Sequence, residues 1–167
     1  MSRSGSATEA QPIRLPLTGG CQCGRIRYEV TAEPLTLYCC HCHECQKQAS
    51  SAFGMSLPLK KEAVRVTSGA PRHWAREAAS GAKVDCVFCG DCGTRLFHES
   101  ERNPGVLVVK PGTLDDTGWL RPIGHIWTSS AQPWIREVLE GVVHEEQPAS
   151  GIAELRAAWL ERTKGAG

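Results

Sequence analysis

Residues 89–93 read Cys-Gly-Asp-Cys-Gly, a cysteine pair with the local chemistry of a zinc knuckle. Glycines beside a cysteine pair permit a tight turn whose backbone N–H groups point at the sulfur atoms. Cys21 and Cys23 are also flanked by glycines, and two such pairs supply the four thiolates of a closed tetrahedral zinc site. We therefore expect a structural metal, bound by Cys21, Cys23, Cys89 and Cys92, whose loss unfolds the protein.

The motif Cys-His-Cys-His-Glu-Cys, which starts at residue 40, is the candidate functional site. Three thiolates from Cys40, Cys42 and Cys45 can surround one face of a metal and leave its fourth position open to water or substrate. An open position favours an enzyme over a scaffold. The interleaved His41 and His43 are alternative metal ligands, groups that hydrogen-bond around the metal, or simply exposed side chains.

Two further cysteines compete with or flank these motifs. Cys86 forms a second Cys-x-x-Cys pair with Cys89, although the glycine that follows Cys92 favours Cys89 and Cys92 as the metal-binding pair. Cys39 precedes Cys40, and neighbouring side chains of an extended segment point in opposite directions. We therefore expect Cys39 to be a small core residue.

Disulfides and iron–sulfur clusters are the alternatives for so many cysteines. The nine cysteines are an odd number, and residues 1–11 carry no apolar segment typical of a secretory signal. We expect a cytoplasmic protein, and thiols in that reducing compartment are metal ligands more often than disulfides. The spacing differs from that of ferredoxins, and the geometry favours zinc over iron–sulfur clusters.

The size and charge of the chain exclude several classes of function. Its 167 residues suit one domain, with a disordered leader at residues 1–12, the zinc-binding domain at 13–147, and a helix and tail at 148–167. The net charge of +1 gives no basic surface for nucleic acid. No apolar run is long enough to cross a membrane. The sequence permits an oligomer without specifying one.

The pattern of short apolar segments and frequent turn residues is typical of a mainly β fold. Strands are expected at residues 25–30, 35–38, 52–57, 63–67, 72–74, 83–88 and 106–110, with Pro58 between two of them. A short helix is expected at 43–50. A clearer C-terminal helix is expected at 150–164, where Ser150 can cap the N-terminus and Ile152, Leu155 and Trp159 share one face.

Residues 124–130 read Gly-His-Ile-Trp-Thr-Ser-Ser and have two interpretations. One is a core strand in which the His125 ring is satisfied by hydrogen bonds. The other is a pocket wall that positions a polar ligand near the open metal. Trp134, which follows Pro133, is expected to pack in the core.

The motifs together resemble the glutathione-dependent formaldehyde-activating enzyme family, which also includes centromere protein V. The resemblance covers about residues 17–137 and is carried by residues 19–28, 40–47, 88–94, 112–116 and 125–134. It implies an Mss4-like fold of folded antiparallel sheets with zinc knuckles, and two zinc ions per chain. The structural zinc then falls on Cys21, Cys23, Cys89 and Cys92, and the second zinc on Cys40, Cys42 and Cys45.

The resemblance also implies carbon–sulfur lyase activity, in which glutathione and formaldehyde interconvert with S-hydroxymethylglutathione. Glu44 and Gln46 stand where family members often carry serine and arginine, so the pocket for the thiol peptide differs in this chain. We expect a zinc-bound thiol such as glutathione to attack a small aldehyde, with His41, His43 or His125 moving the proton. The alternative is a non-catalytic zinc module that binds a protein partner.

Overall fold

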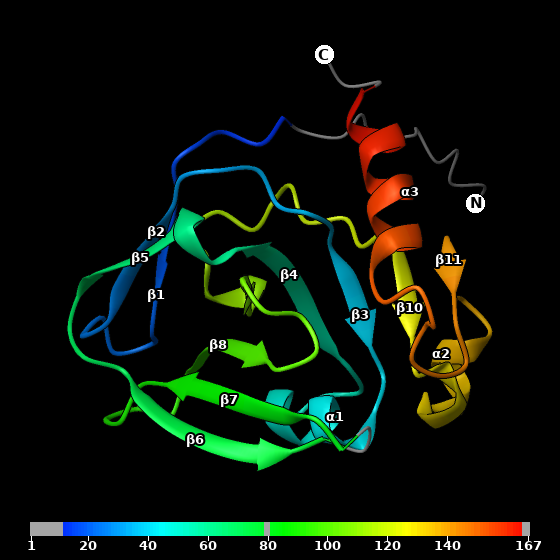
Figure 1. Ribbon diagram of the computed structural model, residues 1–167, viewed down its shortest axis with the longest axis horizontal. Coiled ribbons are helices and arrows are strands. Elements are labelled where there is room, and N and C mark those ends of the chain that lie inside the picture. Colours follow the sequence, from blue (N-terminus) through cyan, green and yellow to red (C-terminus); the bar gives the residue numbers. More distant parts are fainter. Residues whose placement is uncertain (1–11, 79–80, 165–167) are drawn as a thin grey trace, which may run out of the picture.

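The computed structural model describes residues 12–78 and 81–164, and its fold is mainly β, as the sequence predicted. The expected leader at residues 1–12 therefore lies almost entirely outside the described residues, as does the tail at 165–167. Figure 1 shows strands curving around the centre of the molecule, with one longer helix at one side. Among the described residues, no helix has the length and apolar character needed to cross a membrane.

The strands form two sheets. The smaller sheet has the order β1-β2-β5, with β1 at Leu17–Gly20, β2 at Arg27–Val30 and β5 at Val64–Ser68. The larger sheet has eight strands in the order β11-β10-β3-β4-β9-β8-β7-β6. Its strands in chain order are β3 Tyr38–Cys40, β4 Gly54–Lys60, β6 Arg72–Glu77, β7 Lys83–Phe88, β8 Arg95–Ser100, β9 Val106–Val109, β10 Gly124–Ile126 and β11 Val142–Val143.

One edge of the larger sheet departs from the antiparallel arrangement that the resemblance implied. β10 pairs in parallel with both β3 and β11. Its register places His125 opposite Cys39 and Ile126 opposite Cys40. A strand from late in the chain therefore lies beside the strand that carries the first cysteine of the candidate site.

Pro58 lies inside β4, so the expected break between two strands at this residue is wrong. Pro58 pairs with Val108 of β9, and its carbonyl accepts a hydrogen bond from the Leu35 N–H at 2.9 Å. In an antiparallel strand the N–H and C=O of one residue point to the same side. The missing N–H of Pro58 therefore faces Leu35 rather than β9, and the β4–β9 ladder loses no hydrogen bond.

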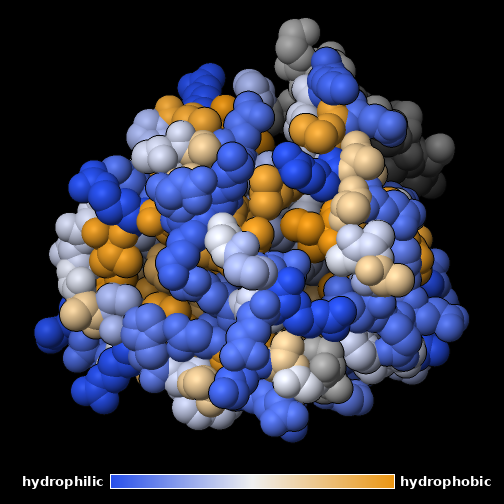
Figure 2. Space-filling model, in the orientation of Figure 1, coloured by the Kyte–Doolittle hydropathy of each residue, from blue (hydrophilic) through white to orange (hydrophobic). Residues whose placement is uncertain are grey.

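The main core lies between the two sheets. Tyr28 of β2 is almost completely buried and packs edge-on against Phe97 of β8, with ring centroids 4.9 Å apart. Val30, Leu57 and Leu96 are fully buried in the same cluster, and each such side chain contributes about 1.5–3 kcal/mol by its burial. Hydrophilic side chains cover most of the face seen in Figure 2, with apolar side chains in the recesses between them.

The helices are short and lie at the ends of strands. They are α1 at His43–Ala49, α2 at Pro133–Arg136 and α3 at Ala153–Lys164, with 3-10 turns η1 at Lys61–Ala63, η2 at Pro111–Thr113 and η3 at Thr128–Ser130. α3 begins three residues later than expected, because Gly151 adopts a left-handed conformation with φ +64°. Its predicted inner face is confirmed, since Leu155 and Trp159 are buried.

Candidate metal centres

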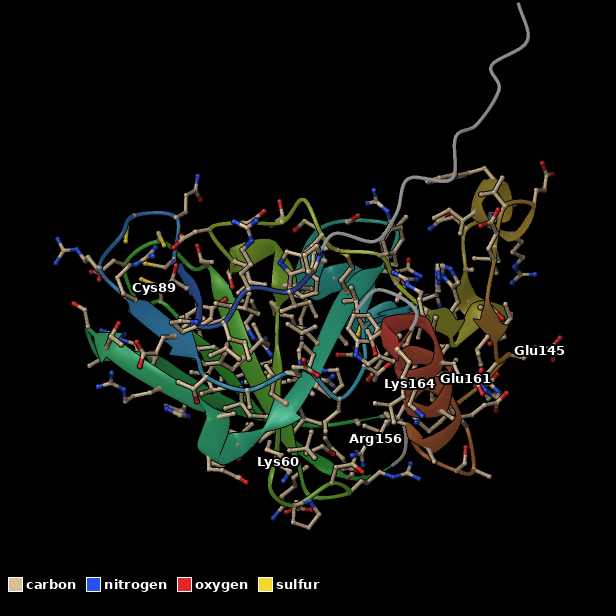
Figure 3. The ribbon with its side chains drawn as sticks, turned by 90° about the horizontal axis from the view of Figure 1, so that it is seen from above. Lys60, Cys89, Glu145, Arg156, Glu161 and Lys164 are labelled. Atoms are coloured by element: carbon tan, nitrogen blue, oxygen red, sulfur yellow. The ribbon has the colours of Figure 1, made fainter. Side chains whose placement is uncertain are left out.

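The structure brings four cysteines together at one corner of the molecule. The sulfur atoms of Cys21, Cys23, Cys89 and Cys92 all lie within 4.8 Å of one another. Cys21 and Cys23 are 3.5 Å apart at sulfur, and Cys23 and Cys89 are 3.8 Å apart. Figure 3 shows Cys89 toward one end of the molecule and the labelled Glu145 at the opposite end.

Two similar backbone turns build this cluster. The Cys21 N–H donates to Ile26 O at 3.0 Å, and the Cys89 N–H donates to Thr94 O at 2.9 Å. Each turn contains a left-handed glycine, Gly24 with φ +77° and Gly93 with φ +74°, a conformation that only glycine adopts without strain. The glycines that follow the cysteine pairs therefore allow each backbone segment to form a tight turn, which brings the two sulfur atoms of the pair to the same side.

The four-cysteine cluster fits a closed metal site. A tetrahedral zinc with bonds of about 2.3 Å to sulfur requires sulfur atoms about 3.8 Å apart. The Ile26 N–H donates to Cys21 Sγ at 3.2 Å, and the Thr94 hydroxyl lies 3.2 Å from Cys92 Sγ. Such hydrogen bonds stabilise thiolates, and that of Thr94 lowers the pKa of Cys92 to about 6. The donor set leaves no position for a substrate.

The second cluster consists of Cys40, Cys42 and Cys45, whose sulfur atoms also lie within 4.8 Å of one another. Cys40 ends β3, Cys42 is the N-cap of α1, and Cys45 lies in the first turn of that helix. The Cys42 sulfur is 3.5 Å from that of Cys40 and accepts from the Cys45 N–H at 3.4 Å. The neighbouring Cys40 and Cys45 thiols lower the pKa of Cys42 to about 2 by hydrogen bonding to its thiolate.

The three-cysteine cluster opens into a cavity of about 560 Å³, which we call the trough. The trough runs across one face of the eight-stranded sheet, and its sides come from α1 and from residues 147–152 before α3. From β10 to β6, its floor includes Ile126, Tyr38, Cys40, Ser56, Val108, His98, Val84 and Arg76. A metal held by the three thiolates would therefore stand beside a space large enough for a small organic molecule.

The candidate histidines occupy different places. His41 is completely buried, and its Nε2 lies 3.0 Å from Nδ1 of His125. Burial and the nearby His125 lower the pKa of His41 to about 4, so this ring is neutral near pH 7. Neither ring belongs to the three-cysteine cluster, whereas His43 lines the trough. The parallel β10–β3 pairing creates the contact between His41 and His125.

Gln46 ties the loop of the three-cysteine cluster to a distant segment, a role that its position in the motif did not reveal. Its side-chain amide donates to the carbonyl of His41 at 2.6 Å and to that of Ser130 at 2.9 Å. Ser130 ends the η3 turn. One side chain therefore joins the loop between Cys40 and Cys42 to a segment more than eighty residues later.

Positive charge near the three cysteines comes from residues that the sequence analysis missed. Burial lowers the pKa of Lys110, an effect opposed by the nearby thiolates of Cys45 and Cys40. The basic residues around the four-cysteine cluster have partners of their own there, because Arg27 pairs with Asp115 and Arg25 lies 3.6 Å from Asp91. Lys110 directly follows β9, and its N–H donates to Leu96 O of β8 at 2.8 Å, a pairing that the local sequence does not reveal.

The two remaining cysteines join neither cluster. Cys39 is buried, and burial raises the pKa of its thiol to about 12. Cys86 of β7 is completely buried, with its thiol 3.7 Å from the carbonyl of Val84. Trp134, expected in the core, is 65% exposed, because it lies on the outer side of the one-turn helix α2 whose Ile135 is buried.

Comparison with known proteins gives two findings. A family model described as "Glutathione-dependent formaldehyde-activating enzyme" matches residues 16–130, more than half of the chain. Among solved structures, a crystal structure of a Rhodobacter sphaeroides protein is similar, with 21% sequence identity and a TM-score of 0.49. That match covers 76% of this chain and 98% of the other.

Proposed function

Because this chain belongs to the glutathione-dependent formaldehyde-activating enzyme family, we propose that it is a zinc-dependent carbon–sulfur lyase. It adds a thiol such as glutathione to formaldehyde or another small electrophile, or catalyses the reverse reaction. The observation that carries this proposal is the contrast between the clusters: four thiolates close one site, and three thiolates line the trough. The open trough favours an enzyme over a module that only binds a protein partner.

The two clusters have separate roles in this proposal. Cys21, Cys23, Cys89 and Cys92 hold a structural zinc. Cys40, Cys42 and Cys45 hold a second zinc, which, when bound, supplies a coordination position where a thiol loses its proton at neutral pH. The free cysteines in both clusters support residence in the reducing cytoplasm.

The chain's own residues bind the reactants and move the proton. The trough holds the thiol and the aldehyde side by side, which replaces a bimolecular encounter by a reaction within one complex. Sulfur bonds to the carbonyl carbon, the π pair of the C=O bond moves to oxygen, and that oxygen takes a proton. His43 is the best candidate to deliver it, because it lines the trough, whereas His41 and His125 hydrogen-bond to each other and do not line it.

A metal and turnover assay on a matched pair of variants tests the function. Cys42→Ala is expected to lower zinc content from two equivalents to about one and to reduce thiol–aldehyde adduct formation at least about a hundredfold, because one of three ligands is lost. Cys39→Ala is the control, since this neighbouring thiol belongs to neither cluster. Full turnover in Cys42→Ala would contradict the proposed function.

A further inference from the structure

The end of the trough formed by β6 and β8 carries basic side chains with unused hydrogen-bonding capacity. His98 of β8 and Arg76 of β6 both line the trough. His98 Nδ1 and Arg76 Nε are shielded from solvent and lack a hydrogen-bond partner among residues 12–78 and 81–164. Buried polar groups nearly always have a partner, so these two residues of one cavity retain hydrogen-bonding capacity that their neighbours do not use.

Several basic side chains surround this end of the trough. Burial lowers the pKa of His98 well below its usual value, and the charges of Lys110, Arg95 and Arg76 lower it further. The acidic partner near Arg76 is Glu44, whose carboxylate is 3.6 Å from the guanidinium. This separation is too long for a good hydrogen bond, and the Glu44 side chain is 42% exposed. One loosely held carboxylate therefore faces several buried basic groups.

An anionic ligand would satisfy both observations. Arginine binds a carboxylate through two parallel N–H donors, and a neutral histidine with its proton on Nδ1 supplies a further donor. The same trough contains the three-cysteine cluster at its α1 side. A molecule with a thiol at one end and a carboxylate at the other would therefore reach both groups within one cavity.

We propose that Arg76 and His98 form an anion subsite that binds the carboxylate of an acidic thiol substrate. That the substrate thiol binds at the three cysteines rests on the proposed function. Binding of the carboxylate is inferred separately, from residues of β6 and β8 that lie outside the cysteine motifs. Glu44 competes with the substrate carboxylate for Arg76 and is displaced when the substrate binds. Neutral thiols of the same size consequently bind more weakly.

The test uses three matched probes and calorimetric titration of the metal-loaded protein. The probes are 3-mercaptopropionate, its methyl ester, which keeps the thiol and loses the charge, and 3-(methylthio)propionate, which keeps the charge and blocks the thiol. We expect the acid to bind roughly ten- to hundredfold more tightly than the ester, as for a charged hydrogen-bonded pair. Arg76→Gln should remove this advantage and leave the affinity for the ester unchanged.

Glu44→Gln separates an anion subsite from a merely structural ion pair. Both variants break the contact between Arg76 and Glu44, yet Glu44→Gln frees the guanidinium and should tighten binding of the acid. If both variants weaken binding together, the ion pair only supports the fold and the subsite is wrong. His98→Asn is expected to weaken binding of the acid less than Arg76→Gln, because it removes a neutral donor.

The outcomes distinguish this proposal from the proposed function. If the acid and its thioether bind equally, and both depend on Arg76, the anion subsite stands while thiol binding at the cysteines fails. If the acid and its ester bind equally in every variant, the subsite is overturned while thiol binding stands.

Discussion

The two cysteine clusters use the same ligand atom in opposite surroundings. The four-cysteine cluster is held by two glycine-containing turns at a corner, and its Cys23 is exposed. The three-cysteine cluster lies at the junction of β3 and α1, where Cys40 and Cys45 are buried beside a cavity and basic groups. The number of cysteines and their surroundings, rather than the type of ligand atom, therefore distinguish the two clusters.

The largest expected effect comes from breaking the four-cysteine cluster. Cys89→Ser should abolish the cooperative thermal unfolding transition, because binding of a structural zinc contributes about 10–16 kcal/mol in small zinc domains. Circular dichroism melting and zinc content measure this loss. Cys86→Ala, in the same strand region but outside both clusters, should melt within a few degrees of the wild type. A Cys89→Ser protein that unfolds at the wild-type temperature would contradict a structural role for this cluster.

A smaller effect should follow from loosening the three-cysteine loop. Gln46→Met keeps the side-chain volume and removes both hydrogen bonds to the carbonyls of His41 and Ser130. Leaving such carbonyls without a partner costs about 1–3 kcal/mol, so denaturant unfolding should show a loss of that size. The second zinc should also pass to a mild chelator faster than in the wild type.

Lys47→Met serves as the control for Gln46, because Lys47 is an exposed residue of the same helix. Equal zinc release from Gln46→Met and the wild type would mean that the hydrogen bonds of Gln46 do not hold the loop.

The smallest expected effect concerns the ion pair beside the four-cysteine turn. Hydrogen bonds from Arg27 and Thr18 hold the pKa of Asp115 below its usual value of 3.8. A lowered carboxyl pKa stabilises the folded state above pH 3.8, and the stabilisation is lost as the pH falls through the lower folded value. Because both side chains are partly exposed, the contribution is below about 1 kcal/mol.

Asp115→Asn should therefore be slightly less stable than the wild type at pH 7, and the difference should shrink as the pH falls below about 4. Denaturant unfolding at several pH values measures this difference, and Asp116→Asn is the neighbouring control. A difference that grows on acidification would mean that folding raises the pKa of Asp115 instead of lowering it.

The sequence allowed prediction of the cysteine groups and the short strands, because spacing and local turn chemistry carry that information. Cys21 and Cys89 lie far apart in the chain, yet the glycines that flank them predict two similar turns. The short helix after Cys42 and the buried face of α3 were also predictable from local pattern.

The surroundings of the second cluster could not be predicted, because they depend on which strands lie side by side. The contact between His41 and His125 needs the parallel pairing of β10 with β3. The meeting of Arg76 and His98 at the trough needs the β6-β7-β8 order. Local patterns contain neither fact, since the partners are separated by long stretches of chain.

The wall of the trough formed by residues 147–152 lies beyond residue 130, where the match to the family ends. The two cysteine clusters lie within the matched residues, whereas this wall of the trough lies outside them. Mutations in this wall can change the shape of the trough while every cysteine of the two clusters stays in place. Under the function proposed above, the range of substrates can therefore change while the candidate metal sites, and the folding that depends on them, stay intact.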